Sequence, residues 1–182
     1  VSFYTQNQLI KIPRIISELK QGKNIALVSD CGTPAVSDPG YYLIKEAVSC
    51  GIRVVALPGP CALITGLVGS ALPTDSFVFL GFLRKKTGKM KKELLEAKAI
   101  NKTIIFYESP HRIIKTLDTC AEVFGGGCEI VLGRELTKKF EEYIRGTVSG
   151  VSDALKNREI LGEFVIIISC KDGNDNRGKA ED

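Results

Sequence analysis

The sequence contains one histidine and no pair of cysteines at CxxC spacing, so it offers no ligand set for a zinc site. It has neither a GxGxxG run nor a Walker loop, which excludes the ordinary dinucleotide-binding and P-loop interpretations. Prolines, glycines and polar residues interrupt the longest apolar stretch, residues 56–72, and no membrane-spanning helix is therefore expected. The net charge of +4 is too small to imply general binding to polyelectrolytes.

Cysteines are present but scattered. They favour reduced thiols in a cytoplasmic protein over disulfides or nucleophiles, and they are Cys31, Cys50, Cys61, Cys120, Cys128 and Cys170. No basic segment followed by an apolar core opens the chain, so no signal peptide is visible. With 182 residues, 44% of them hydrophobic, the chain is long enough for one large domain or two small ones.

The most informative stretch is IALVSDCGTPAVSDPG, residues 25–40. Its apolar beginning predicts a buried strand at residues 25–29, and the remainder predicts a loop of small and acidic residues. Ser37 or Asp38 is then expected to cap a helix whose first residue is Pro39. Ligand sites of open α/β sheets lie at such strand ends, although an ordinary strand-to-helix connection has the same pattern.

Three more predicted strands end in loops of this kind. LPGPCA follows an apolar run, and Pro60 stands where a helix would begin. FYESPHR ends the next such strand, with Ser109 as the expected N-cap and Pro110 as the first helical residue. GRELTK closes the strand at residues 129–134. Because the carboxyl ends of strands in such sheets meet at one edge, these loops predict a single convergent site.

The motifs SDxGTPxxSDPG, PGPCA, FYESPHR and RELTKxxEE occur in this order and resemble those of the tetrapyrrole methylase superfamily. The resemblance is strongest to its bacterial branch that methylates a cytidine ribose 2′-oxygen in 16S ribosomal RNA, and it extends from about Asn7 to about Ser169. It implies an S-adenosylmethionine (SAM) dependent methyltransferase with two α/β lobes, a cofactor cleft between them and a homodimeric assembly. Members usually begin with a strand and a proline-bearing loop before the helix near Asn7, so an N-terminally truncated first lobe is expected.

Periodicity places the elements of an α/β fold along the chain. The first lobe, residues 1–72, is expected to be a parallel doubly wound unit without its first strand, containing a helix from near Asn7 to Gly22, strands at 25–29 and 52–57, and helices at 41–49 and 60–71. The second lobe, residues 73–172, is expected to have a mixed sheet, with strands at 77–80, 103–107, 129–134, 142–146 and 164–169 and helices at 89–100, 110–124 and 151–156. A flexible tail is expected at residues 173–182.

The resemblance also implies which residues bind SAM. The first loop would hold the methionine end through backbone groups, Val36 would line the pocket, and residues 134–136 would border the adenine. Glu108 stands where related tetrapyrrole enzymes place a methionine against the cofactor. Asp30 and Asp38 stay open between binding the amino group and capping helices. The implied set is Asp30, Cys31, Gly32, Thr33, Val36, Cys61, Ala62, Glu108, Arg134, Glu135 and Leu136.

Methylation of a ribose hydroxyl requires in-line positioning, and a base or a cation near the oxygen assists it. The candidates are His111, which is the single histidine, Arg112 and Lys138, with Glu141 as a further possible base. The alternative interpretation is that His111 and Arg112 cap a helix or contact phosphate.

A dense basic run follows the strand at residues 77–80, and its position at a strand-to-helix junction suits contacts with RNA phosphates. A solvated helix face explains the same charges equally well. The run consists of Arg84, Lys85, Lys86, Lys89, Lys91 and Lys92. Aromatic residues suited to stacking are sparse, which favours structured 16S ribosomal RNA or an assembled small ribosomal subunit as the partner over a single strand.

Three functions stay open from the sequence. The first is a 16S ribosomal RNA ribose methyltransferase. The second is a methyltransferase of the same fold that acts on a tetrapyrrole or on a protein residue. The third is a truncated chain that folds without activity. None of the three requires a metal ion or a membrane.

Overall fold

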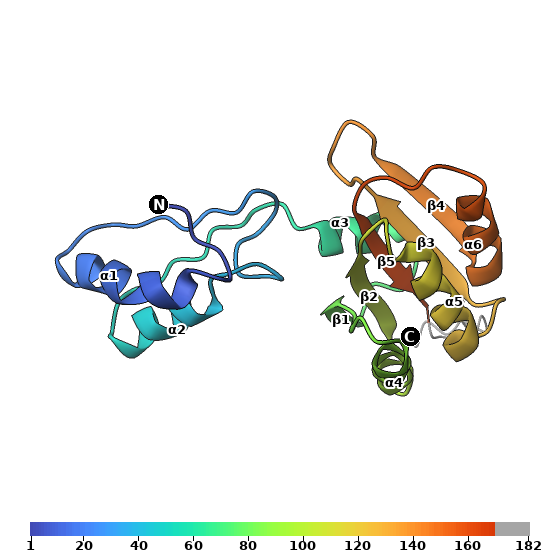
Figure 1. The fold of residues 1–182 in the computed structure, drawn as a ribbon, viewed down its shortest axis with the longest axis horizontal. Coiled ribbons are helices and arrows are strands. Elements are labelled where there is room, and N and C mark those ends of the chain that lie inside the picture. Colours follow the sequence, from blue (N-terminus) through green and yellow to red (C-terminus); the bar gives the residue numbers. More distant parts are fainter. Residues whose placement is uncertain (170–182) are drawn as a thin grey trace, which may run out of the picture. The chain divides into compact units, whose positions relative to one another are not determined.

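The computed structural model describes residues 1–169. The chain divides into two compact units, Val1–Cys61 and the part that begins at Ala62 (Figure 1). The helix at residues 62–70 packs with the second unit. The lobe boundary expected after residue 72 stays a prediction. The flexible tail expected at residues 173–182 lies outside the described residues.

A mixed sheet forms the centre of the second unit, with five strands in the order β1-β2-β5-β3-β4. Strands β1 and β2 are parallel, and every other neighbouring pair is antiparallel, so the mixed sheet expected for the second lobe is confirmed. The strands are β1 (Phe77–Phe82), β2 (Thr103–Glu108), β3 (Glu129–Arg134), β4 (Glu142–Thr147) and β5 (Phe164–Ile168).

Helices cover both faces of this sheet. The main core lies between one face and the helices α4 (Thr87–Lys98), α5 (Ile113–Phe124) and α6 (Val148–Lys156), whereas α3 (Ala62–Ser70) packs on the central strands from the other side. Successive side chains of a strand point to opposite faces, so Ile104 and Phe106 join the main core while Ile105 points to the side of α3. Every predicted strand and helix after residue 73 is found, with ends that agree within three residues.

Two tyrosines and two glycines hold α3 on the sheet. The hydroxyl of Tyr143 donates a hydrogen bond to the carbonyl of Thr65 at 3.0 Å, and the hydroxyl of Tyr107 accepts one from the amide of Leu63 at 3.2 Å. A Cβ on Gly66 would lie 3.0 Å from Cγ1 of Val165. A Cβ on Gly69 would collide with the phenol of Tyr143. The helix therefore approaches the sheet more closely than a helix with larger residues on this face.

The first unit contains two helices, α1 (Gln8–Lys20) and α2 (Tyr41–Ser49). They pack against each other through a small apolar cluster of Ile12, Ile16, Leu43 and Ala47. Gly22 follows the end of α1 with φ of +85°, a conformation that glycine adopts without strain, and the predicted end of this helix is confirmed.

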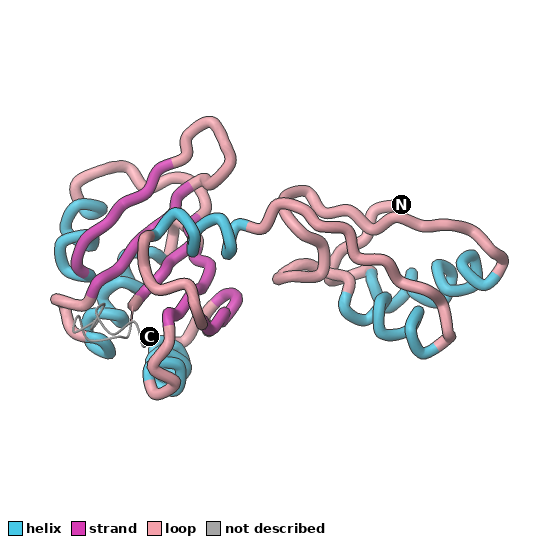
Figure 2. Tube along the Cα trace, turned by 180° about the vertical axis from the view of Figure 1, so that it is seen from behind, coloured by secondary structure: helices cyan, strands magenta, loops and turns pink. Residues whose placement is uncertain are grey.

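The two strands predicted for the first unit, at residues 25–29 and 52–57, are wrong. Both segments run as loops, and within residues 1–61 the structure contains no strand (Figure 2). Val28 is 80% exposed and Leu57 is 79% exposed, so neither segment is buried as a sheet strand would be. An apolar segment becomes a strand only when a neighbour supplies hydrogen-bond partners along a ladder, and among residues 1–169 no such ladder joins either segment to a neighbour.

The helix caps predicted from serine and proline are also wrong. Helix α2 begins at Tyr41 after Gly40, and Ser37 has φ of +61°, which differs from the extended backbone of a capping residue. Residues 109–112 form a turn, with the amide of Arg112 donating to the carbonyl of Ser109 at 3.1 Å, and α5 begins only after it. Pro110 occupies the second position of this turn, a common place for proline. Helix α3 likewise begins two residues after Pro60.

Among the helices of residues 1–169, none has both the length and the apolar character that crossing a bilayer requires.

Candidate functional site

The two predicted cofactor loops of the first unit lie side by side. The hydroxyl of Thr33 donates a hydrogen bond to the carbonyl of Pro60 at 2.9 Å, and a Cβ on Gly32 would lie 3.6 Å from the same oxygen. The hydroxyl of Ser29 donates to the carbonyl of Gly32 at 2.8 Å. The fold of this unit therefore brings the SDCGTP segment against the PGPC segment that ends at Cys61.

The backbone of the first loop winds tightly. Gly32, Ala35 and Ser37 have φ of +77°, +67° and +61°, in the left-handed region that costs residues other than glycine some energy. Cys31 and Asp30 are exposed, and Val36 is only partly covered. Small side chains on a winding backbone leave its main-chain groups open to a ligand.

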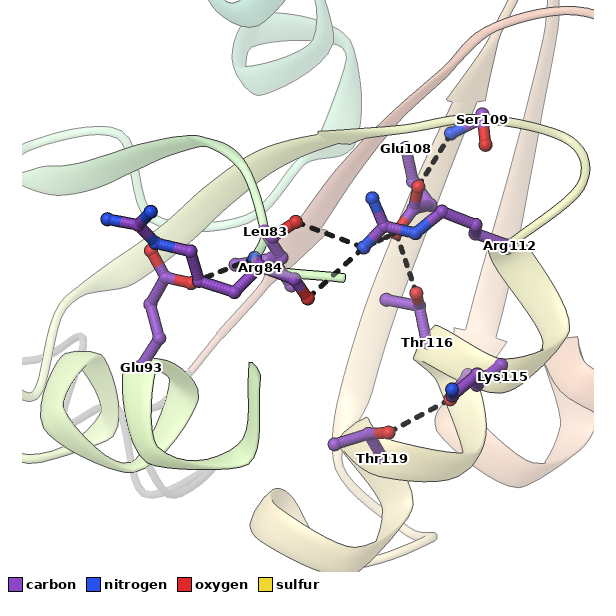
Figure 3. A network of polar contacts seen from close by, with 9 residues as sticks. All are labelled: Leu83, Arg84, Glu93, Glu108, Ser109, Arg112, Lys115, Thr116 and Thr119. Carbon is purple, nitrogen blue, oxygen red and sulfur yellow. Dashed lines mark hydrogen bonds and ion pairs between the residues drawn. The ribbon is translucent and has the colours of Figure 1, made fainter. Parts of the chain in front are cut away.

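In the second unit, Glu108 ends β2 in a fully satisfied environment. Its side chain is 0% exposed. One carboxylate oxygen accepts from the amide of Ser109 at 2.8 Å, and the other accepts from the hydroxyl of Thr116 at 2.7 Å (Figure 3). The second oxygen also pairs with the guanidinium of Arg112 at 3.3 Å. These three protein groups already bind the carboxylate of Glu108. Its predicted contact with SAM stays a prediction.

Arg112 extends this network to another loop. Its Nη2 donates to the carbonyls of Leu83 at 3.0 Å and of Arg84 at 3.4 Å (Figure 3). The amide of Arg84 in turn donates to Oε2 of Glu93 in α4 at 3.2 Å. His111 lies beside Arg112 in the turn before α5, and its side chain is exposed. Of the two, His111 therefore has the more accessible side chain for a substrate.

The loop that follows β3 is held together by its own motif residues. Glu135 accepts a hydrogen bond from the amide of Glu163 at 2.8 Å, and this bond holds the pKa of Glu135 below its usual value. Lys138 bridges Glu163 at 2.9 Å and Glu135 at 3.1 Å. The hydrogen bond to Glu163 is the main reason that the pKa of Lys138 is raised. Lys138 thus stays charged, which suits it to a cationic role and disfavours it as a base.

Arg134 and Glu142 close the base of the same loop. Nε of Arg134 donates to the carbonyl of Leu161 at 2.6 Å, and its Nη1 lies 3.4 Å from Glu142. Arg158 approaches the other carboxylate oxygen of Glu142 at 2.8 Å and is the main cause of a lowered pKa of Glu142. Glu141, the further base candidate, accepts from the amide of Thr137 at 2.6 Å.

Leu136, predicted to lie at the adenine side, is buried and folds back over the end of β3. A Cβ on Gly133 would lie 2.8 Å from Cδ1 of Leu136, and one on Gly66 would lie 3.4 Å from the same atom. Leu136 therefore packs over Gly133 at the end of β3 and beside Gly66 of α3.

The structure separates the six predicted RNA contacts into groups. Arg84, Lys89 and Lys92 line a pocket of about 420 Å³ together with Glu93 and Glu96. Lys91 instead forms an ion pair with Glu122 of α5 at 2.9 Å. Lys85 and Lys86 are exposed in the loop before α4. The run therefore presents five cations on the loop and the first turns of α4, with two carboxylates among them, and directs Lys91 toward a neighbouring helix.

Two members of the Glu108 network were absent from the sequence-based candidates. The hydroxyl of Thr116 reaches the carboxylate of Glu108 from the first turn of α5, eight residues further along the chain. Because Glu108 belongs to β2, no local spacing signals this contact. Glu93 gave no local signal either, because its contact with Arg84 depends on how the loop folds back onto α4. In the described part of the chain, histidine, cysteine and acidic side chains form no group of three or more that would suit a metal ion.

These loops and this mixed sheet define a class of protein. Residues 5–152 match the family described as Tetrapyrrole (Corrin/Porphyrin) Methylases, and the chain belongs to this family. A uroporphyrin-III C-methyl transferase from Thermus thermophilus, complexed with S-adenyl homocysteine, matches with a TM-score of 0.63 at 14% identity over 92% of this chain and 75% of the other. At that identity the likeness shows the fold alone.

Within the family, the chain is similar to proteins named ribosomal RNA small subunit methyltransferase I. The one from Vibrio cholerae serotype O1 is 44% identical over 180 residues, which cover 99% of this chain and 57% of the relative. The one from Bacillus subtilis (strain 168) is 46% identical over 168 residues, which cover 92% of this chain and 57% of the relative. The chain therefore spans somewhat more than half the length of these relatives.

Proposed function

We propose that this chain is part of a SAM-dependent methyltransferase that 2′-O-methylates a cytidine ribose in 16S ribosomal RNA of the small subunit. The observation that carries the proposal is the identity of 44% and 46%, over nearly the whole chain, to relatives named ribosomal RNA small subunit methyltransferase I. The motifs FYESPHR and RELTKxxEE and the basic loop before α4 agree with it. No comparable observation favours a tetrapyrrole or a protein residue as the acceptor.

The first unit fits the cofactor in this proposal. The SDCGTP loop has small side chains and a winding backbone, so a ligand can reach its main-chain amides and carbonyls. The bond between Thr33 and Pro60 holds the second loop, with Cys61, beside it. SAM supplies the methyl group on a sulfonium, which is already a good leaving group. The residues assigned to this side are Asp30, Cys31, Gly32, Thr33, Val36 and Cys61, together with Ala62 at the start of the second unit. Arg134, Glu135 and Leu136 are assigned to the adenine.

The protein then has to orient the ribose and receive its proton. Bound SAM would supply the methyl group to the 2′-oxygen and leave as the thioether, and the hydroxyl proton would pass to a base. His111 is the assigned base, because its side chain is exposed at the turn before α5. Lys138 is assigned as a cation that stabilises developing negative charge on the oxygen, in keeping with its raised pKa.

Calorimetry with SAM and a methyl-transfer assay test the proposal together. The chain and the full-length Bacillus subtilis relative are titrated with SAM, and each is then incubated with radiolabelled SAM and unmodified small ribosomal subunits. The expected product is 2′-O-methylcytidine in 16S ribosomal RNA, identified by nuclease digestion and mass spectrometry. The substitution His111→Gln in this chain should lower kcat while SAM affinity is kept. Label found in ribosomal protein, and none in RNA, would overturn the proposal.

The assembly and the location of the protein complete the proposal. We assign a homodimer and a cytoplasmic location, and the partner is 16S ribosomal RNA or the small ribosomal subunit. Light scattering after size-exclusion chromatography measures the mass in solution, and a mass of one chain across micromolar concentrations would overturn the dimer. Co-sedimentation with purified small subunits, in comparison with large subunits, tests the partner.

A further inference from the structure

A single side chain, that of Arg112, connects the turn before α5 to the basic loop before α4. Its Nη2 donates to two consecutive carbonyls, those of Leu83 and Arg84, at 3.0 and 3.4 Å. Hydrogen bonds from a charged donor are stronger than those between neutral groups. Because one donor group binds two consecutive carbonyls, it also fixes the orientation of the backbone that carries them. Arg112 therefore fixes the backbone at the point where the basic loop leaves β1 (Figure 3).

The same loop is held from its other side by α4. Oε2 of Glu93 accepts from the amide of Arg84 at 3.2 Å. The backbone of Arg84 thus has its carbonyl bound by Arg112 and its amide bound by Glu93. Its side chain lines the pocket that also contains Lys89 and Lys92. These two backbone contacts determine where the charges of the loop point.

Arg112 is itself held by a buried group. Glu108 lies 3.3 Å from its guanidinium, and the carboxylate also accepts from Thr116 at 2.7 Å and from the amide of Ser109 at 2.8 Å. The Arg112 side chain is only 24% exposed. All three contacts use Nη2, so the protein fixes the guanidinium in place at the loop. These contacts favour a role in positioning over a role in the chemical step.

We propose that Arg112 is a positioning residue for RNA binding: together with Glu108 it fixes the backbone of the basic loop, so that Arg84, Lys85 and Lys86 meet RNA phosphates in one arrangement. The inference rests on the proposed function and deepens it, because it names the contacts, away from the reacting atoms, that fix where RNA binds on the protein. Ordering the loop before binding removes part of the entropy that RNA binding would otherwise cost. Arg112 binds the loop from the same turn that contains His111. RNA bound by the loop would therefore have a fixed position relative to His111.

Hydrogen exchange and RNA affinity test the inference in the same variants. Arg112→Gln removes the charged donor, and Lys115→Gln removes one exposed charge from α5 without touching the loop. We expect Arg112→Gln to raise the exchange rate of the Arg84 amide, which donates to Glu93, at least about tenfold and to weaken binding of a 16S ribosomal RNA transcript about tenfold. Lys115→Gln should leave the exchange rates unchanged and weaken RNA binding by less than about threefold. Arg112→Lys should have exchange rates and RNA affinity between those of Arg112→Gln and Lys115→Gln, because an ammonium replaces only part of the planar guanidinium's set of donors.

The outcomes separate this inference from the proposed function. Unchanged exchange of the Arg84 amide in Arg112→Gln would overturn the positioning role. Raised exchange with a loss of RNA affinity no larger than that of Lys115→Gln would overturn its link to RNA. Failure of the proposed function shows elsewhere, as absence of methyl transfer to RNA by the full-length relative, and leaves the exchange result intact.

A second pair of variants does not disturb the buried carboxylate. Glu93→Gln and Glu93→Ala lose the same charge, but only glutamine keeps an acceptor for the amide of Arg84. Loss of a carboxylate near the cations by itself strengthens RNA binding. The positioning role predicts that Glu93→Ala binds the transcript about threefold more weakly than Glu93→Gln, and equal affinities would contradict it.

Discussion

The two units of this chain contain similar apolar segments and use them differently. In the second unit, Phe106 and Ile166 are fully buried in paired strands. In the first unit, Val28 and Leu57 belong to segments of the same character, yet they lie in exposed loops. Strand propensity is therefore only a condition for a strand, and a neighbouring strand with free hydrogen-bonding groups is also required.

The difference extends to the candidate site. In the second unit, predicted site residues such as Glu108 and Lys138 are engaged by several protein groups, and their positions are fixed by them. In the first unit, Thr33 has one such bond to a neighbouring loop and Cys31 is exposed. The part of the site in the first unit is thus held mainly by loop geometry, whereas the second unit holds its part by charged networks.

The largest expected effect is in amide hydrogen exchange. Amides in the central strands of the second unit, such as Ile105 and Ile167, should be protected at least about 10³-fold, because they open only with large parts of the unit. Amides at residues 25–29 and 53–57 should exchange near the rates of unstructured peptides. Mass spectrometry of pulse-labelled protein measures both sets at once. Strong protection of the amides in the two first-unit segments would show that these segments form strands in solution. The contrast drawn here between the two units would then be wrong.

A pair of glycine substitutions gives the next largest effect. Gly69→Ala places a methyl group against the phenol of Tyr143 and breaks its bond to Thr65, so we expect it to lower the free energy of unfolding by about 1–3 kcal/mol. Gly59→Ala in the first unit meets no atom within 4 Å and should change it by less than about 0.5 kcal/mol. Urea denaturation followed by circular dichroism measures both. Equal effects would mean that α3 is not held closely by the sheet.

The smallest expected effect is the pH dependence contributed by Glu142. Arg158 and then Arg134 hold the pKa of its carboxyl below the ordinary value of 4.5. A lowered pKa in the folded state adds stability above the ordinary pKa, and this stability is lost as the pH falls through the lowered value. Because the carboxylate is partly exposed, the contribution should be below about 0.5 kcal/mol. Glu142→Gln should therefore reduce the loss of stability between pH 5.5 and pH 3 slightly.

Glu18→Gln is the matched control in the first unit, where Arg14 holds the pKa of Glu18 below its usual value. It should leave the unfolding of the second unit unchanged at every pH. The measurement is a series of urea curves at several pH values for both variants. A pH dependence that Glu18→Gln alters and Glu142→Gln does not would place the acid sensitivity in the first unit.

The sequence predicted the second unit well because local pattern and tertiary pairing agree there. The strand at residues 129–134 was predicted with its observed ends, and β4 follows it as an antiparallel neighbour. The family assignment, made from four motifs, is confirmed by the match over residues 5–152. These motifs are local in sequence, so they can be recognised without knowledge of the fold.

The remaining features depend on contacts between distant residues. Ser109 and Pro110 have the composition of a helix start, but Glu108 binds the amide of Ser109 and the helix begins after the turn. Arg112 has the chemistry of a catalytic cation, yet its partners Leu83 and Arg84 are 28 or 29 residues away in sequence. No local pattern shows such partners. The assigned roles of the site residues stay predictions until they are measured.

The packing of Leu136 over Gly133 and beside Gly66 has a consequence for how the family varies. A side chain larger than hydrogen at position 133 would need the space that Leu136 fills, and position 66 borders the same space. Gly133 and Leu136 are three residues apart, and the fold brings Gly66 of α3 to them, so the three positions should change together among relatives. A larger residue at 133 should be inherited with a smaller one at 136, so the pair would form a covariation signal that records the closure of this loop on the sheet.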